Sequence, residues 1–184
     1  LLPPLGTPPS VGPLLPSGAA GLVQPLEDGA LLVWIVNLED SERTHAIPLH
    51  ALGFTGSTHV YDVWTDTYRG IEEERIVFGP LRPHASELLR LVPSDGNPRI
   101  VGSTFHLSGG TGNRAQTTRG ARVCFDLRGT RSGRVLLDAG SGYPQAVHLE
   151  TTGELELVLL DLQNQGAPTD TKGAEGAKAG EPST

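Results

Sequence analysis

The sequence predicts an all-β protein, an antiparallel β-sandwich with Greek-key-like connections. In residues 26–162, turn residues interrupt the chain every 8–12 positions, which is the spacing of short strands in a sandwich. No window of the 184-residue chain repeats apolar residues at helical spacing between caps, and only residues 49–54 resemble a short helical turn. We therefore expect strands joined by turns rich in Gly, Pro, Ser and Asn, with very little helix.

Ten runs in this central part have the length and composition of strands. They are rich in β-branched and aromatic residues, which favour strands. The predicted strands are residues 30–37, 44–49, 58–64, 74–78, 86–92, 98–107, 121–127, 133–138, 145–150 and 154–162. The Gly-rich segment 109–114 lacks the ending of a phosphate-binding loop and no helix pattern follows it, so we interpret it as a hairpin loop.

The two ends of the chain differ from this centre. Residues 1–25 contain seven of the fifteen prolines and predict an extended strap, because proline fixes φ and lacks an amide donor. Residues 163–184 have no aromatic or branched aliphatic side chain, which predicts a disordered tail. The expected organisation is thus a strap (1–25), a β-sandwich domain (26–162) and a tail (163–184).

The start of the chain suggests a piece of a longer protein. The sequence contains no methionine, even at position 1. Its opening residues lack the basic and apolar regions of a signal peptide, which leaves the cellular location open and slightly favours the cytoplasm.

Strand 30–37 carries apolar residues on both of its faces. When one face of a strand meets water, apolar and polar residues normally alternate along the strand. This run instead reads ALLVWIVN, with apolar residues at nearly every position. We expect something to cover the second face. A neighbouring sheet with a loop is one explanation, and a missing partner domain is the other.

Composition excludes several classes of function. The formal charge of −7 argues against binding to nucleic acids or anionic membrane surfaces, which reward clustered Lys and Arg. No run approaches the ~20 apolar residues of a membrane-spanning helix. A single cysteine, Cys124, rules out an internal disulfide and a Cys-based zinc cluster, and we expect it to be buried as a small hydrophobe. We expect no cofactor.

Candidate carboxylates do not form a convincing catalytic pair. Asp62 and Asp66 lie four residues apart, so on one strand their Cα atoms are about 13 Å apart. A retaining glycosidase needs its two carboxyl groups roughly 5–5.5 Å apart, and an inverting enzyme ~6.5–9.5 Å. The run of glutamates at 72–74 is typical of a solvated turn. We therefore predict no catalytic residue, while a site assembled from distant carboxylates stays open. These carboxylates are Asp62, Asp126, Asp138 and Asp161.

The histidines and some aromatic residues are candidates for two kinds of site, a metal site and a sugar-binding site. The six histidines lack metal-binding spacing, so we predict no metal site, although ligands from distant strands stay possible. Aromatic rings can stack on the C–H faces of sugar rings, whereas most large aromatic side chains pack in cores. The residues that we consider for sugar contact are Trp64, Tyr68 and Tyr143.

A series of short motifs, in order, resembles a known family. These are LLPPLG (1–6), GALLVWIVNLED (29–40), SERTHAIPL (41–49), ALGF (51–54), VYDVWTDTYRG (60–70), GPLRPHASELLRL (79–91) and PRIVGSTFHLSGG (98–110). Together they resemble the C-terminal part of melibiase-type glycoside hydrolases, the α-galactosidase group of clan D. The motifs cover about residues 1–108, and residues 120–162 fit by strand pattern alone.

The resemblance implies an accessory role. In that family a β-sandwich docks on a (β/α)8 barrel, and the barrel carries a nucleophilic Asp and an acid/base Asp for retaining hydrolysis. No position here matches those catalytic motifs. The implied function is a non-catalytic C-terminal domain that stabilises a barrel, its expected partner, with no activity of its own. The alternative from another class is an independent carbohydrate-binding module.

Overall fold

The computed structural model describes residues 18–26, 28–105, 117–119, 122–127, 131–151 and 156–161. Within these ranges the protein is built almost entirely of strands, and each strand pair is antiparallel. The predicted all-β, antiparallel class is confirmed. The expected tail, most of the strap and the Gly-rich loop at 109–114 lie outside the described residues. No helix in the described ranges is long and apolar enough to cross a membrane.

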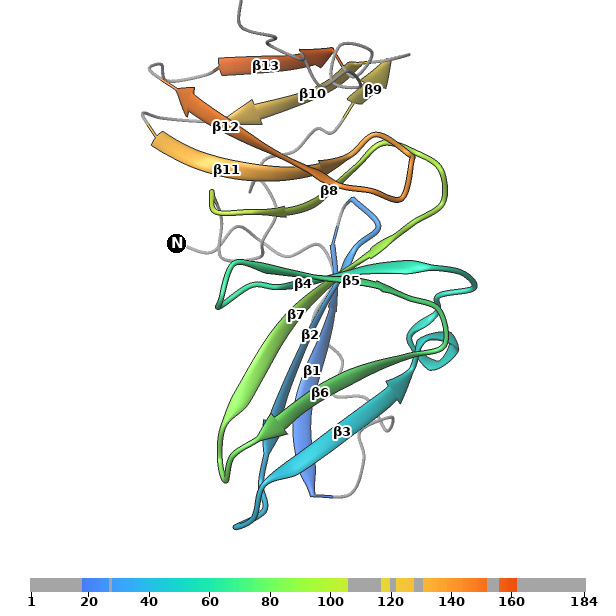
Figure 1. Cartoon of the computed structure of the whole chain (residues 1–184), viewed down its shortest axis with the longest axis vertical. Coiled ribbons are helices and arrows are strands. Elements are labelled where there is room, and N and C mark those ends of the chain that lie inside the picture. The colour runs from blue at the N-terminus through green and yellow to red at the C-terminus, as the bar shows by residue number, and fades with distance from the viewer. Residues whose placement is uncertain are drawn as a thin grey trace, which may run out of the picture.

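A five-stranded sheet, which we call the central sheet, organises the molecule (Figure 1). Its strands, in spatial order, are β1 (Ala19–Pro25), β2 (Leu31–Asn37), β7 (Ser86–Pro93), β4 (Thr58–Asp62) and β5 (Thr67–Glu72). A two-stranded sheet of β3 (Arg43–Pro48) and β6 (Arg75–Leu81) pairs separately, and a single 3-10 turn, η1 (Leu49–Leu52), follows β3. This turn confirms the short helical element expected at 49–54.

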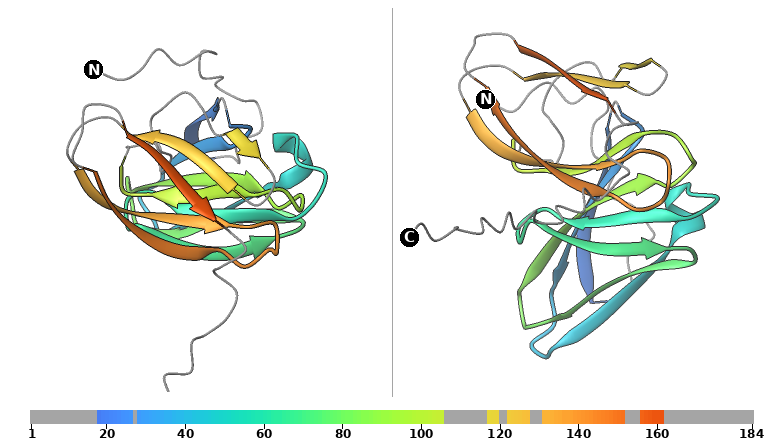
Figure 2. Two further views of the ribbon diagram at one scale, coloured as in Figure 1. Left: turned by 90° about the horizontal axis from the view of Figure 1, so that it is seen from above. Right: turned by 45° about the horizontal axis from the view of Figure 1, so that its top comes forward.

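The second half of the chain adds two three-stranded sheets. The nearer one, the cover sheet, consists of β8 (Arg99–Ser103), β11 (Arg131–Asp138) and β12 (Gln145–Thr151). The other consists of β9 (Thr117–Arg119), β10 (Arg122–Leu127) and β13 (Glu156–Asp161). In Figures 1 and 2 the cover sheet lies between the central sheet and the β9–β10–β13 sheet.

The main hydrophobic core lies between the central sheet and the β3–β6 pair. Alternate residues of β2, β7 and β4 point to this side, because successive side chains of a strand face opposite ways. The buried residues of this cluster are Val33, Ile35, Ile47, Leu49, Phe54, Val60, Ile76, Phe78, Leu81, Leu89 and Leu91. This cluster joins residues 33 to 91 into one sandwich.

A second, smaller core lies on the opposite face of the central sheet. There Tyr61 of β4 packs with Val101 of β8 and Leu136 of β11. Gly102 in β8 is essential to this contact, because a Cβ at this position would lie 2.5 Å from carbon atoms of the Tyr61 ring. The cover sheet therefore packs closely on the central sheet.

The doubly apolar strand 30–37 is partly explained by this arrangement. Val33 and Ile35 of β2 enter the main core, while Leu32, Trp34 and Val36 face the other side and are half-buried. Near Leu32 that face carries the buried Arg90, which reaches β8. The neighbouring-sheet explanation thus accounts for one end of the strand. The row Leu22–Trp34–Leu88 beyond it is an apolar, half-buried surface.

All ten predicted strands occur, and three strands were not predicted. Residues 19–25 form β1, although the sequence analysis placed them in the Pro-rich strap. Proline is compatible with this position because β1 is an edge strand and Pro25 is its last residue. The other two additions are β5 and β9.

Candidate functional site

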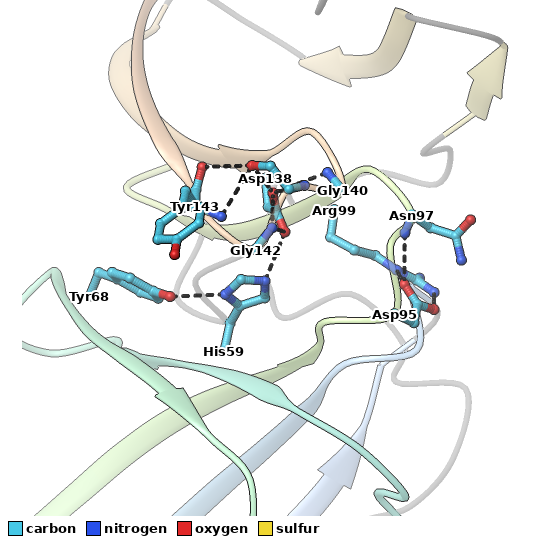
Figure 3. Close-up of polar contacts among 10 residues, drawn as sticks. His59, Tyr68, Asp95, Asn97, Arg99, Asp138, Gly140, Gly142 and Tyr143 are labelled. Atoms are coloured by element: carbon cyan, nitrogen blue, oxygen red, sulfur yellow. Dashed lines mark hydrogen bonds and ion pairs between the residues drawn. The ribbon is translucent and has the colours of Figure 1, made fainter. Parts of the chain in front are cut away.

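A buried polar network joins the central sheet to the cover sheet (Figure 3). Its members are His59 of β4, Tyr68 of β5 and Asp138 of β11, and we call it the His59 network. Nδ1 of His59 lies 3.0 Å from the Tyr68 hydroxyl oxygen, and Nε2 lies 3.0 Å from Oδ2 of Asp138. The imidazole is fully buried and the carboxyl group almost so. Since an ionised carboxylate only accepts hydrogen bonds, Nε2 carries the proton and Nδ1 accepts from the hydroxyl.

The carboxylate of Asp138 also shapes the turn between β11 and β12, residues 139–144, which we call the Tyr143 turn. Oδ1 accepts hydrogen bonds from the amides of Gly140 (3.0 Å), Ser141 (3.0 Å) and Gly142 (3.1 Å). Gly140 and Gly142 both have positive φ, and a Cβ on Gly140 would lie 2.3 Å from the carbonyl oxygen of Gly96. One side chain therefore holds both a rigid turn and an intersheet contact.

Burial dominates the electrostatics of this network. Desolvation lowers the pKa of His59 below its ordinary value of 6.5, and the hydrogen bond and charge of Asp138 oppose this only in part. Burial, followed by the negative charge of Asp138, raises the pKa of Tyr68. The imidazole is thus neutral and the phenol protonated near neutral pH.

The lowered pKa of His59 predicts a loss of stability in acid. Above pH 6.5 the imidazole is neutral in both folded and unfolded chains. Below that pH the unfolded chain takes up a proton first, so the free energy of unfolding falls, by at most about 1.4 kcal/mol per pH unit. Denaturant titrations between about pH 7 and pH 5 measure this slope. The slope is expected to be shallower in His59→Gln, and an equal slope in both proteins would contradict it.

Asp62 and Asp66, the pair considered for catalysis, serve the β4–β5 turn. Asp62 is buried and accepts hydrogen bonds from the amides of Trp64 and Thr65, each at 3.0 Å. Asp66, at a positive φ of 52°, accepts from the Tyr61 hydroxyl and forms a 2.7 Å ion pair with Arg134 of β11. Burial and then Asp66 raise the pKa of Tyr61. Each carboxylate has a structural partner, and the Arg134 contact is a second tie between the sheets.

Of the wider set of carboxylates, the structure describes the side chains of Asp62 and Asp138 and assigns a structural contact to each. Asp138 belongs to the His59 network, whereas Asp62 caps a turn. Asp126 and Asp161 lie in β10 and β13, outside the residues whose side chains are described. No group of three or more His, Cys, Asp or Glu side chains in the described ranges is arranged to hold a metal ion.

A buried ion pair ties the β1–β2 loop to the same interface. Arg90 of β7 is 1% exposed, and its Nη2 donates to the Asp28 carboxylate and, at 3.4 Å, to the Ile100 carbonyl. Arg99 donates to the Asp28 carbonyl at 3.0 Å. Within the part of the chain that the structure describes, Nε and Nη1 of Arg90 have no hydrogen-bond partner, and Asp28 compensates the charge of the guanidinium.

The three aromatic residues considered for sugar contact lie in different local settings. Trp64 is 56% exposed in the β4–β5 turn, two residues before Asp66. Tyr68 is half-buried in the His59 network, and Tyr143, 81% exposed, stands on the turn that Asp138 holds. Figure 3 shows Tyr143 on the same side of the network as Tyr68. Tyr68 and the turn that carries Tyr143 are thus both connected to Asp138, whereas Trp64 stands on the β4–β5 turn.

The His59 network is not evident from sequence patterns. His59 and Asp138 are 79 positions apart, so no local motif connects them. The signal in the sequence is a short apolar run beside each residue: Val60 and Tyr61 follow His59, and residues 135–137 precede Asp138. A polar side chain in such a run requires a buried partner.

Comparison with known families gives a match to part of the chain. Residues 19–91 match the alpha galactosidase C-terminal beta sandwich domain. The resemblance expected from the sequence motifs is therefore confirmed over this range. The matched α-galactosidase C-terminal domain runs from β1 through most of β7 and includes the whole main core. Residues 92–184, which include the cover sheet, lie outside the match.

Solved structures of glycoside hydrolases show similarity to part of the chain. A GH27 β-L-arabinopyranosidase from Geobacillus stearothermophilus is 22% identical with a TM-score of 0.40, and 42% of this chain and 18% of that one are covered. α-Galactosidase I from Mortierella vinacea is 17% identical with a TM-score of 0.37, covering 41% and 21%. The chain therefore spans about a fifth of the length of these enzymes. A search of curated protein sequences gave no match.

Proposed function

We propose that this chain is a non-catalytic accessory β-sandwich of an α-galactosidase-like glycoside hydrolase, which packs on a catalytic barrel and stabilises it. The observation that carries this proposal is the match of residues 19–91 to the α-galactosidase C-terminal domain. The carboxylates support it, because Asp62 and Asp66 are engaged in turns and intersheet contacts. Retaining hydrolysis needs two free carboxyl groups in one cleft, which the barrel would supply.

The row Leu22–Trp34–Leu88 is the surface that we assign to the barrel contact. It crosses β1, β2 and β7 on the face opposite the main core, and its three side chains are half-buried. Large apolar side chains on adjacent strands are what a tightly packed domain contact requires. Within the described residues, the cover sheet packs on the same face of the central sheet, beside this row.

Hydrolysis of nitrophenyl glycosides tests the non-catalytic role. The purified chain is expected to release no nitrophenol from nitrophenyl α-galactoside above the buffer background, while an intact α-galactosidase does so under the same conditions. Turnover that co-purifies with the folded chain and is lost in a carboxylate variant would overturn the proposal. The coding sequence upstream of Leu1 is a second test, because the accessory role requires a barrel encoded there.

A further inference from the structure

We infer that Tyr143, together with Tyr68, forms a contact site for a neutral pyranose sugar. The site lies on the Tyr143 turn and the adjoining edge strand β5. It goes beyond the accessory role proposed above, since sugar binding here needs no barrel. The inference is built on exposure, rigidity and the chemistry of the surrounding side chains.

Tyr143 is exposed on a turn whose backbone amides are held by the buried carboxylate of Asp138. Its side chain is 81% exposed, although its neighbours in the turn are bound to the buried carboxylate of Asp138. The hydroxyl of Ser141 lies 3.2 Å from the amide nitrogen of Tyr143 and accepts its hydrogen bond. Binding therefore orders little of the turn, which lowers the entropic cost of a weak contact.

Apolar surface beside Tyr143 continues onto β5. Ile71 is 39% exposed, and its Cδ1 atom would lie 3.6 Å from a Cβ built on Gly142. Tyr68, from the same strand, is half-buried, and its hydroxyl is already bonded to His59. Figure 3 shows the Tyr68 and Tyr143 side chains on one side of the network. The site thus combines the exposed ring of Tyr143 and the exposed aliphatic side chain of Ile71 with the half-buried Tyr68 from the same strand as Ile71.

The polar groups around this surface favour an uncharged ligand with many hydroxyls. Ser94 lies near the same turn, with its Oγ 3.8 Å from a Cβ built on Gly142. Asp95 and Arg99 are paired with each other at 2.7 Å, so neither offers a free charge to an ionic ligand. The Arg99 hydrogen bond holds the pKa of Asp95 at about 2, so this pair persists across neutral pH. The aromatic surface matches the C–H faces of a pyranose ring. The neutral hydroxyl of Ser94 and the paired Asp95 and Arg99 match its uncharged hydroxyl groups.

Titration of the full chain with methyl α-galactoside and with raffinose, followed by NMR, tests the inference. Shifts are expected in the resonances of the Tyr143 turn and β5, with millimolar dissociation constants. Tyr143→Ala is expected to weaken binding about tenfold, whereas Tyr143→Phe, which keeps the ring, binds as the parent does. Trp64→Ala removes an exposed aromatic residue from the β4–β5 turn, outside the proposed site, and is the matched control, expected to leave binding unchanged.

Three results would overturn the site. The first is the absence of saturable shifts with either sugar up to about 50 mM. The second is equal sugar affinity in Tyr143→Ala and the parent chain. The third is a loss of sugar affinity in Trp64→Ala alone. None of these results bears on the nitrophenyl assay or on the presence of a barrel, so failure of this site and failure of the accessory role are distinguishable.

Discussion

Replacing Asp28 by asparagine is expected to lower the free energy of unfolding by about 3 kcal/mol. The buried guanidinium of Arg90 has this carboxylate as its charged partner, and two of its nitrogens form no hydrogen bond with any described residue. Removing one partner of a buried ion pair leaves an uncompensated charge, which typically costs 3–5 kcal/mol, and we take about the lower end because the Asp28 side chain is one-fifth exposed. Asparagine keeps the acceptor for the Ala30 amide, so the loss reports the charge.

Two further variants decide this interpretation, with stability measured by chemical denaturation. Asp95→Asn breaks the exposed ion pair with Arg99 and is expected to cost less than about 1 kcal/mol. The double variant Asp28→Asn/Arg90→Met removes both charges and is expected to recover most of the lost stability, because methionine fills the site without a charge to compensate. A double variant no more stable than Asp28→Asn would show that Arg90 acts through something other than its charge.

Sequence periodicity is sufficient to predict the buried strands of the central sheet and insufficient to predict the strands at its edges. Strand β2 was predicted because its unbroken apolar run has no other explanation, and the structure buries Val33 and Ile35. Strand β5 was not predicted, because its residues Thr67–Glu72 lie at the edge of the central sheet and are mostly exposed. An edge strand buries little and so has little apolar signal. The same reason explains β1, whose single proline, Pro25, is tolerated at an edge.

The candidate site depends on contacts that sequence spacing does not encode. The aromatic candidates follow from residue type alone, and only the structure connects Tyr68 with the Tyr143 turn through His59 and Asp138. Asp62 and Asp66 were rejected as a catalytic pair on strand geometry, whereas their partners (turn amides, the Tyr61 hydroxyl and Arg134) depend on the tertiary fold. Local sequence thus predicted which residues to examine, and the packing of β11 on β4 decided their roles.

The cooperative folding unit is expected to extend beyond the part of the chain that matches the family. The family match stops at residue 91, but three ties cross from the matched domain to the cover sheet. These are His59 with Asp138, Arg134 with Asp66, and Arg90 with the Ile100 carbonyl. Because each tie involves a buried or charged group, residues beyond 91 stabilise the matched domain, and the two parts are expected to unfold together.

Replacing Asp138 by alanine is the most direct test of this coupling, with an expected loss of about 3 kcal/mol. The carboxylate accepts hydrogen bonds from the buried His59 imidazole and from three turn amides. The amides can bind water once the turn loosens, whereas the imidazole stays buried without a partner, so most of the cost arises there. Thermal or denaturant unfolding measures the loss, and a single transition at lower stability is expected.

Asp138→Asn is the matched control, because it separates the shape of the side chain from its charge. The amide oxygen keeps the bonds to the turn, and His59 can shift its proton to Nδ1, accept from the amide at Nε2 and donate to the Tyr68 hydroxyl. The loss is therefore expected to be about 1 kcal/mol, clearly smaller than in Asp138→Ala. Equal stability of the parent chain and Asp138→Ala would show that the two sheets are held together without the His59 network. Unfolding of Asp138→Ala in two separate transitions would instead show that this network is what makes them a single cooperative unit.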